Sequence, residues 1–110
     1  MEFLFLICSD STAPVYRPAE DDIEEWVGEV ERRGIGRAGD RLRLPADATT
    51  VTVRDGGLVV ADGPFAETKD YIAGFDLVEC ADLDDAIDLA SRHPMARFGQ
   101  IEIRPVWPLG

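Results

Sequence analysis

The chain has 110 residues, a length that suits one domain, residues 1–110, with a single core and leaves no room for a second domain. Hydrophobic residues make up 45% and charged residues 30% of the sequence, as in globular and not in disordered proteins. The formal charge of -11 repels phosphate backbones and anionic lipid surfaces. We therefore expect neither direct nucleic-acid binding nor membrane binding.

The N-terminus and the cysteines indicate the compartment. Residues 1–8 are apolar, but they lack the basic region, the length and the cleavage site of a secretory signal. No segment reaches the roughly 20 apolar residues of a membrane span. Cys8 and Cys80 fit no metal-ligand spacing and lie in apolar runs, where a free cysteine packs as a small hydrophobe. We expect a cytoplasmic protein with reduced thiols, without a metal site and without a cofactor.

The first third of the chain predicts a strand and then a helix. Residues 3–8 form a continuous apolar run that is too short for a helix, so they predict a strand with both faces covered. Four apolar residues then recur at the i, i+3, i+4 and i+7 spacing of an amphipathic helix: Ile23, Trp26, Val27 and Val30. Residues 35–47 contain glycines, a proline and scattered arginines without periodicity, and we interpret them as a connection.

The middle of the chain predicts a β-hairpin. Residues 49–54 and 57–61 are rich in β-branched side chains, and Asp55-Gly56 between them supplies the two positive φ angles of a tight turn. The turn fixes the register, which places four apolar side chains on one side of the hairpin: Val51, Val53, Leu58 and Val60. By the same alternation Asp62 starts on that side.

The last third predicts a strand at residues 75–80, a helix at residues 82–93 with Asp82 as its N-cap, and a final strand at residues 100–107. The order of elements favours two helices on one face of a mainly antiparallel sheet. The first strand then needs a cover on its other face. A second copy of the chain is the simplest cover, because isologous dimers are the commonest oligomers.

Residues 62–69, Asp-Gly-Pro-Phe-Ala-Glu-Thr-Lys, are the most distinctive stretch, and they lie between two predicted strands. Together with Gly74-Phe75, His93-Pro94 and the closing residues 102–106, they make the chain resemble the DGPF family of YCII-related proteins over nearly its whole length. The resemblance implies a ferredoxin-like fold that pairs into a dimeric α+β barrel with a cleft beside the sheet. The expected fold class is therefore α+β, with a ferredoxin-like antiparallel sheet, two helices on one face and an extra β-hairpin.

The resemblance implies no settled activity. Better-studied YCII-type relatives are proposed to be enzymes because of a His-Asp pair in the cleft, and DGPF proteins are often associated with extracytoplasmic-function sigma factors. The histidine on the first helix of YCII-type proteins has no counterpart here, since residues 18–34 contain none. The proposed dyad therefore does not carry over as it stands.

Two residues are candidates for acid–base catalysis. Asp62, at the end of a hairpin strand and near Phe65 and Phe75, is placed to have a raised pKa and to act as general acid or base. The alternative is a turn in which its carboxylate accepts backbone N–H bonds. His93, the only histidine, is a candidate proton shuttle, and the alternative is that it complements the end of a helix.

Four further residues are candidates for binding a small anionic or carbonyl substrate: Glu67, Thr68, Lys69 and Arg104. The alternatives are that Thr68 caps a short helical turn and that Glu67 and Lys69 are solvated or pair with Arg104. Arg104 is equally compatible with an internal salt bridge to Asp62 or Glu67. Two functions stay open on the sequence. One is a homodimeric enzyme that acts by acid–base chemistry in the cleft, and the other is a regulator that binds a ligand, or a protein such as a sigma factor, without turnover.

Overall fold

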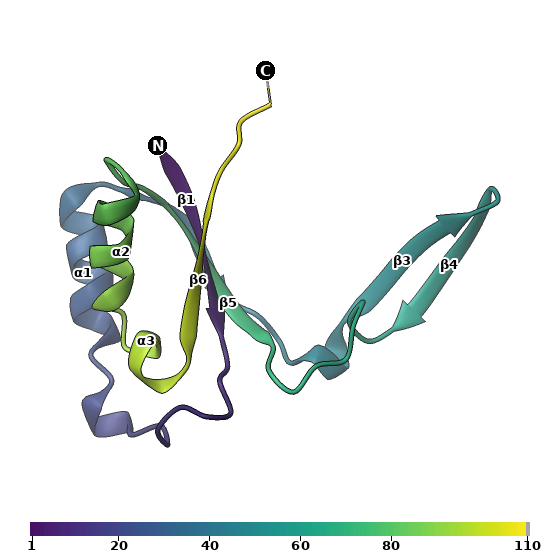
Figure 1. Cartoon of the computed structure of the whole chain (residues 1–110), viewed down its shortest axis with the longest axis horizontal. Coiled ribbons are helices and arrows are strands. Elements are labelled where there is room, and N and C mark those ends of the chain that lie inside the picture. The colour runs from purple at the N-terminus through teal and green to yellow at the C-terminus, as the bar shows by residue number, and fades with distance from the viewer. Residues whose placement is uncertain (110) are drawn as a thin grey trace.

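The computed structural model describes residues 1–109 as an α+β fold, in which helices cover one face of a four-stranded antiparallel sheet and a β-hairpin stands apart (Figure 1). In chain order the elements are β1 (Glu2–Cys8), η1 (Pro18–Glu20), α1 (Ile23–Arg33), β2 (Gly36–Arg41), η2 (Pro45–Asp47), β3 (Thr49–Arg54), β4 (Gly57–Asp62), β5 (Ile72–Glu79), α2 (Leu83–Ser91), α3 (Met95–Phe98) and β6 (Gln100–Pro105). No helix within residues 1–109 is long and apolar enough to cross a membrane.

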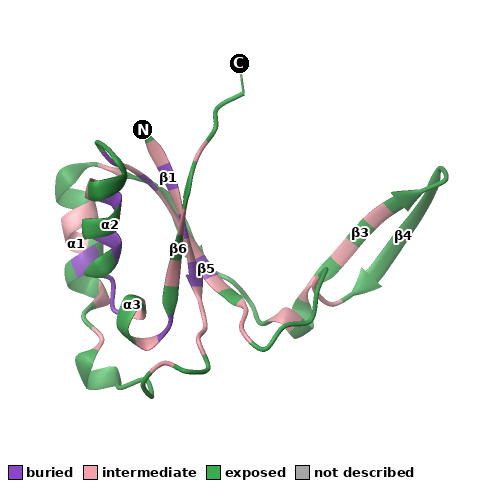
Figure 2. Cartoon of the chain, in the orientation of Figure 1, coloured by how far each residue is buried: buried purple, intermediate pink, exposed green. Residues whose placement is uncertain are grey.

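Strand β1 lies inside the sheet, whose strand order is β2-β5-β1-β6. Its alternate residues Phe3, Phe5 and Ile7 are buried on the side of the helices, where they form the core with residues of α1, β5 and α2 (Figure 2). Its other residues, among them Leu4 and Leu6, are only partly buried. The sheet therefore has a covered face and a second face, which we call the open face, that no helix covers.

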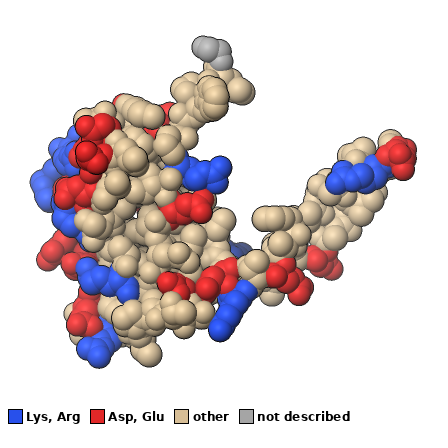
Figure 3. Space-filling view, in the orientation of Figure 1, with Lys and Arg blue, Asp and Glu red and all other residues tan. Residues whose placement is uncertain are grey.

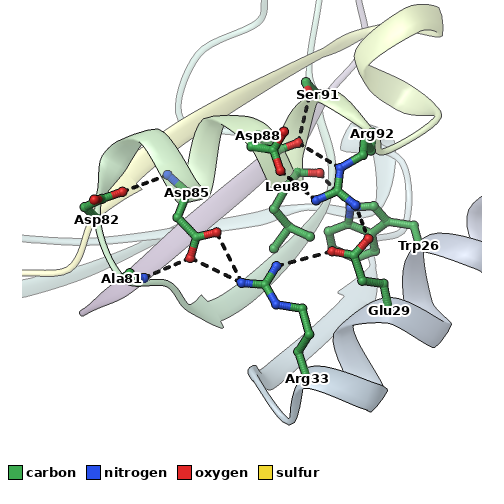
Figure 4. Close-up of polar contacts among 10 residues, drawn as sticks. All are labelled: Trp26, Glu29, Arg33, Ala81, Asp82, Asp85, Asp88, Leu89, Ser91 and Arg92. Carbon is green, nitrogen blue, oxygen red and sulfur yellow. Dashed lines mark hydrogen bonds and ion pairs between the residues drawn. The ribbon is translucent and has the colours of Figure 1, made fainter.

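The two long helices are tied to each other by polar as well as apolar contacts. The buried indole of Trp26 on α1 donates a hydrogen bond of 2.8 Å to the carbonyl oxygen of Leu89 on α2. A cluster of ion pairs joins their outer surfaces, with Glu29 paired to both Arg33 and Arg92, and Arg33 paired to Asp85 at 3.2 Å (Figure 4). These contacts fix α1 beside α2 on the covered face.

Two helix ends follow the expected physical chemistry, whereas the N-cap residue of α1, Asp22, makes no capping hydrogen bond with its side chain. The predicted N-cap of the second helix is confirmed, because the carboxylate of Asp82 accepts a 2.8 Å hydrogen bond from the amide of Asp85. Helix α1 ends at Gly34, whose φ of 64° is in the left-handed region that glycine adopts without strain.

Strand β2 corrects one prediction, since residues 36–41 were expected to belong to a connection. They pair antiparallel with β5 at the edge of the sheet. All six residues are exposed, so the strand shows none of the apolar alternation that predicts strands from sequence. The missing side chain of Gly39 makes room for its neighbour, because a Cβ there would lie 2.1 Å from the carboxylate of Asp76.

The hairpin has the predicted register, with Val53 opposite Leu58 and Val51 opposite Val60. Its turn uses positive φ at Asp55 (52°) and Gly56 (76°). It does not join the main sheet but projects from it (Figure 1). The chain consequently has a radius of gyration of 16.2 Å, whereas about 13 Å is usual for a compact chain of this length. We call β3 and β4 together the arm.

Candidate functional site

A hollow of about 1100 Å³ lies where the base of the arm meets one end of the sheet. We call it the arm-base hollow. Its lining comes from three segments and two single residues: residues 42–51, 63–68 and 70–72, Cys8 and Gln100. Cys8 and Gln100 face each other on β1 and β6. The hollow therefore lies at the junction of the open face and the arm.

Backbone contacts hold the two sides of the hollow together. The amide of Gly63 donates a 2.7 Å hydrogen bond to the carbonyl of Ala48, and the hydroxyl of Thr50 donates one of 2.7 Å to the carbonyl of Gly63. Gly63 has a φ of 100°, which a residue with a side chain rarely adopts. The amide of Leu42 donates to the carbonyl of Ala73 on β5 at 2.8 Å, so the segment before the arm is anchored to the sheet.

Asp70 is the best-anchored polar residue of the lining, and the sequence did not single it out. Its carboxylate accepts hydrogen bonds from the Ser9 hydroxyl at 3.2 Å and from the Ser11 amide at 2.8 Å. The Ser9 hydroxyl also accepts one from the amide of Tyr71 at 2.9 Å. The carbonyl of Asp70 accepts a hydrogen bond from the Thr68 hydroxyl. These bonds hold the carboxylate toward Ser9 and Ser11, which do not line the arm-base hollow, so Asp70 belongs to the wall between that hollow and a second one.

The charged groups of the lining are mostly acidic. Asp47, Glu67 and Asp70 face a single cation, Arg43, which pairs with Asp47 at 3.0 Å. Carboxylates lie around the corner between the body and the arm (Figure 3). A dianionic or strongly acidic ligand therefore meets repulsion here, whereas a neutral or cationic one does not. The rest of the lining is mainly apolar, with Leu44, Phe65 and Ile72 among its residues.

The structure brings two of the predicted substrate-binding residues, Glu67 and Thr68, into the lining of the arm-base hollow. Lys69 lines a second, smaller hollow of about 350 Å³ on the other side of Asp70 and Tyr71. Asp62 is exposed at the end of β4, on the same side of the arm as Val60. Within residues 1–109 its carboxylate accepts no hydrogen bond, so the turn that was the alternative interpretation does not form.

Arg104 lies apart from the arm-base hollow, on the open face of β6. It pairs with Glu102 two residues before it at 3.2 Å, and both side chains are more than half exposed. The salt bridge to Asp62 or Glu67 expected as an alternative does not form within residues 1–109, and Arg104 has an exposed ion pair with Glu102 in its place. Arg104 lines neither of the two hollows described for residues 1–109.

His93 is buried in the helix layer. Its Nδ1 accepts a 3.0 Å hydrogen bond from the amide of Met95, and its ring meets the ring of Trp26 edge-on with centroids 4.7 Å apart. Burial lowers the pKa of His93 to about 4. Within residues 1–109 it lines neither hollow, so the structure does not bring it together with Asp62.

Burial also shifts the pKa of two groups on the strands of the main sheet, Asp76 and Cys8. Burial raises the pKa of the Asp76 carboxyl to about 6; this residue lies on the covered face, opposite Phe5 and Gly39. Burial, and then the charge of Glu102, raises the pKa of the Cys8 thiol, which is therefore a neutral part of the lining at pH 7. No three His, Cys, Asp or Glu side chains in the described part of the chain are grouped in a way that could hold a metal ion.

This geometry defines the class of protein: an α+β domain with an open sheet face and a hollow beside it. The chain belongs to the YCII-related domain family, whose model matches residues 6–110. It is 35% identical over 104 residues to the uncharacterized protein R00369 of Rhizobium meliloti (strain 1021), a match that covers 88% of this chain and 84% of the relative. The family is thereby established, and the activity is not.

Proposed function

We propose that this protein binds a small, mainly apolar metabolite carrying a carbonyl or hydroxyl group in the arm-base hollow, and that it does so as a homodimer of the dimeric α+β barrel type. The observation that carries the proposal is the hollow itself, with its apolar lining and its few convergent polar groups. Ligand sites usually measure about 300–1,000 Å³. At about 1100 Å³ in one chain, the hollow leaves room for a second copy to narrow it.

The ligand chemistry follows from the polar groups. The carboxylate of Asp70 accepts hydrogen bonds and so suits a ligand hydroxyl group, whereas the side-chain amide of Gln100 donates them and so suits a carbonyl group. The excess of carboxylates over Arg43 favours a neutral or cationic ligand over an anionic one. Of the two ligand classes expected from the sequence, we therefore propose a carbonyl compound in preference to a small anion.

Turnover, in this proposal, transfers a proton from the carbon next to the carbonyl group to a carboxylate of the lining. The electron pair of the broken C–H bond stays on the ligand as an enolate, and return of the proton to the ligand completes an isomerisation. Glu67 is the carboxylate of the lining that has no hydrogen-bond partner within residues 1–109, so it is available to accept a proton from a ligand. Asp62 lies beyond the rim on the arm, where it meets a ligand that extends out of the hollow. His93 has no role in this chemistry.

The proposal is tested by a thermal-shift screen of matched neutral, cationic and anionic carbonyl compounds. A ligand at 100 times its Kd stabilises the native state by about 2.7 kcal/mol, which raises the Tm by about 10 °C in a domain of this size. Ala66→Trp fills the hollow and is expected to abolish the shift. Ala61→Trp, on the arm but outside the lining, is the matched control and is expected to keep it. Equal shifts in both variants contradict the location.

A further inference from the structure

We propose that the arm packs against a second copy of the chain, and that this copy closes the open side of the arm-base hollow. The inference rests on the homodimer proposed above and names the surface that forms it. The site of one copy is then incomplete until the other copy is bound.

One side of the arm, its inner face, continues into the hollow. Val51 lines the hollow, and the strand register places Val53, Leu58 and Val60 on the same side as Val51. These side chains are 59%, 60%, 69% and 58% exposed in chain order. Single exposed apolar residues are normal on a protein surface, whereas a contiguous row of four marks an interaction surface.

The open face of the sheet also ends at the hollow. Leu4 and Leu6 on β1 lie opposite Leu77 and Phe75 on β5, and all four side chains point away from the helices. Cys8, which shares their face of β1, lines the hollow. The arm and the body diverge from their junction (Figure 1), and the open face combines this apolar centre with charged side chains on β6.

The arm lacks the packing that an isolated hairpin needs. It is a two-stranded sheet of its own, and two strands without a third strand or a covering helix are at best marginally stable in water. Its strands present apolar side chains on both sides, since Val59 on the outer face is also 49% exposed. A cover on the inner face would bury the longer apolar row.

The distribution of charge leaves surfaces through which a second copy of this chain can form that cover. Two copies of net charge -11 repel each other at long range, so they can meet only through surfaces poor in charge. The inner face carries no charge from Val51 to Val60. On the open face the apolar centre is flanked by charged residues such as Glu102 and Arg104. An apolar centre with a charged rim is the usual anatomy of an interface.

The areas of the arm and of the open face also suit an interface between two copies of the chain. Strands of six residues are about 20 Å long and lie about 4.8 Å apart, so the arm offers about 200 Å² in projection and the four-stranded open face about 400 Å². Together these approach the roughly 800 Å² per partner of a standard interface, since accessible area exceeds its projection. A two-fold axis lets each arm reach the other copy, as in an isologous dimer.

The test combines sedimentation equilibrium with hydrogen–deuterium exchange of the full chain over a range of concentrations. We expect dimers in which the amides of residues 51–60 exchange at least 100-fold more slowly than in the monomer. Val53→Asp, on the inner face, is expected to raise the dimer Kd at least 10-fold. Val59→Asp is the matched control on the outer face, and we expect it to change the Kd less than 3-fold.

The outcomes separate this inference from the proposed function. If dimers form but their arm amides exchange as fast as those of the monomer, the arm does not contact the second copy. The proposed homodimer is then retained. Equal Kd changes in Val53→Asp and Val59→Asp also contradict the contact of the arm with a second copy. A chain that stays monomeric contradicts both the contact of the arm with a second copy and the homodimer. Ligand binding by that monomer would still support the arm-base hollow as the binding site.

Discussion

Replacing Asp76 by Asn tests whether a partly buried carboxylate lowers the stability of this fold at neutral pH. Asp76 lies on the covered face of β5, opposite Phe5 and Gly39. Burial raises its pKa from 3.8 to about 6, and no hydrogen bond to its carboxylate within residues 1–109 offsets the loss of water. The native state therefore binds the proton more tightly than the unfolded chain does.

The sign and size of the effect follow from this difference. The protonated carboxyl stabilises the native state fully below pH 4, and this contribution is lost as the pH rises through 6. Two pKa units correspond to roughly 3 kcal/mol. Because Asp76 is only partly buried and keeps some contact with water, we expect about 1–2 kcal/mol at pH 7. Asn cannot ionise, so Asp76→Asn should be more stable than the wild type by that amount.

The assay is urea unfolding at pH 7 and at pH 4, followed by the fluorescence of the buried Trp26 at one protein concentration. The gain from Asp76→Asn should be present at pH 7 and absent at pH 4. Asp55→Asn, in the exposed hairpin turn with a φ of 52° that Asn tolerates, is the matched control and should show no such gain. A loss of stability at pH 7, or a gain that persists at pH 4, would refute the reasoning.

Three further substitutions test other parts of the structure. In the Asp76→Asn background, the free energy of unfolding should fall by up to about 3 kcal/mol as the pH drops from 6.5 to 4. Burial lowers the pKa of His93 to about 4, so protonation in this range favours the unfolded chain. His93→Gln should flatten this dependence of stability on pH, and an unchanged slope contradicts the assignment to His93. Glu29→Gln should lower the free energy of unfolding by about 1 kcal/mol at low salt and by less at high salt, since Glu29 pairs with two arginines, while Glu24→Gln should have no effect. Asp62→Asn should leave the Tm unchanged, and a fall of several degrees in calorimetry would assign that carboxylate a structural role.

The fold could be predicted where local patterns determine it. The apolar spacing on α1, the Asp82 cap of α2 and the Asp55-Gly56 turn each act over a few residues, and the structure confirms them. Strand β2 could not be predicted, because an edge strand exposed on both faces has no apolar alternation. Its existence depends on pairing with β5, which lies far away in the sequence.

The arm shows the limit of strand prediction in another way. Its turn and register follow from the residues between Thr49 and Asp62. Whether a hairpin joins a sheet or projects from it depends on contacts with segments far away in the sequence. Within residues 1–109 β2 and β6 are the edge strands of the main sheet, and the hairpin pairs with neither of them. Local sequence carries no signal for that choice.

The candidate site could be predicted only in its central segment. Glu67 and Thr68 line the arm-base hollow as expected. Asp70 was missed as the oriented carboxylate, because its partners Ser9 and Ser11 lie about 60 residues earlier and nothing in the local sequence links them. The pairing of Arg104 with Glu102 could have been expected from the alternation of β6, which places both on one face.

The central claim is that the arm-base hollow binds a small molecule, and mapping the binding by NMR tests it most directly. Titrating the labelled wild-type chain with the strongest hit of the thermal-shift screen should move the amide resonances of residues 46–48 and 67–71, with smaller changes elsewhere. Shifts confined to the outer surfaces of α1 and α2, with the resonances of Thr68 and Asp70 unmoved, would contradict the claim.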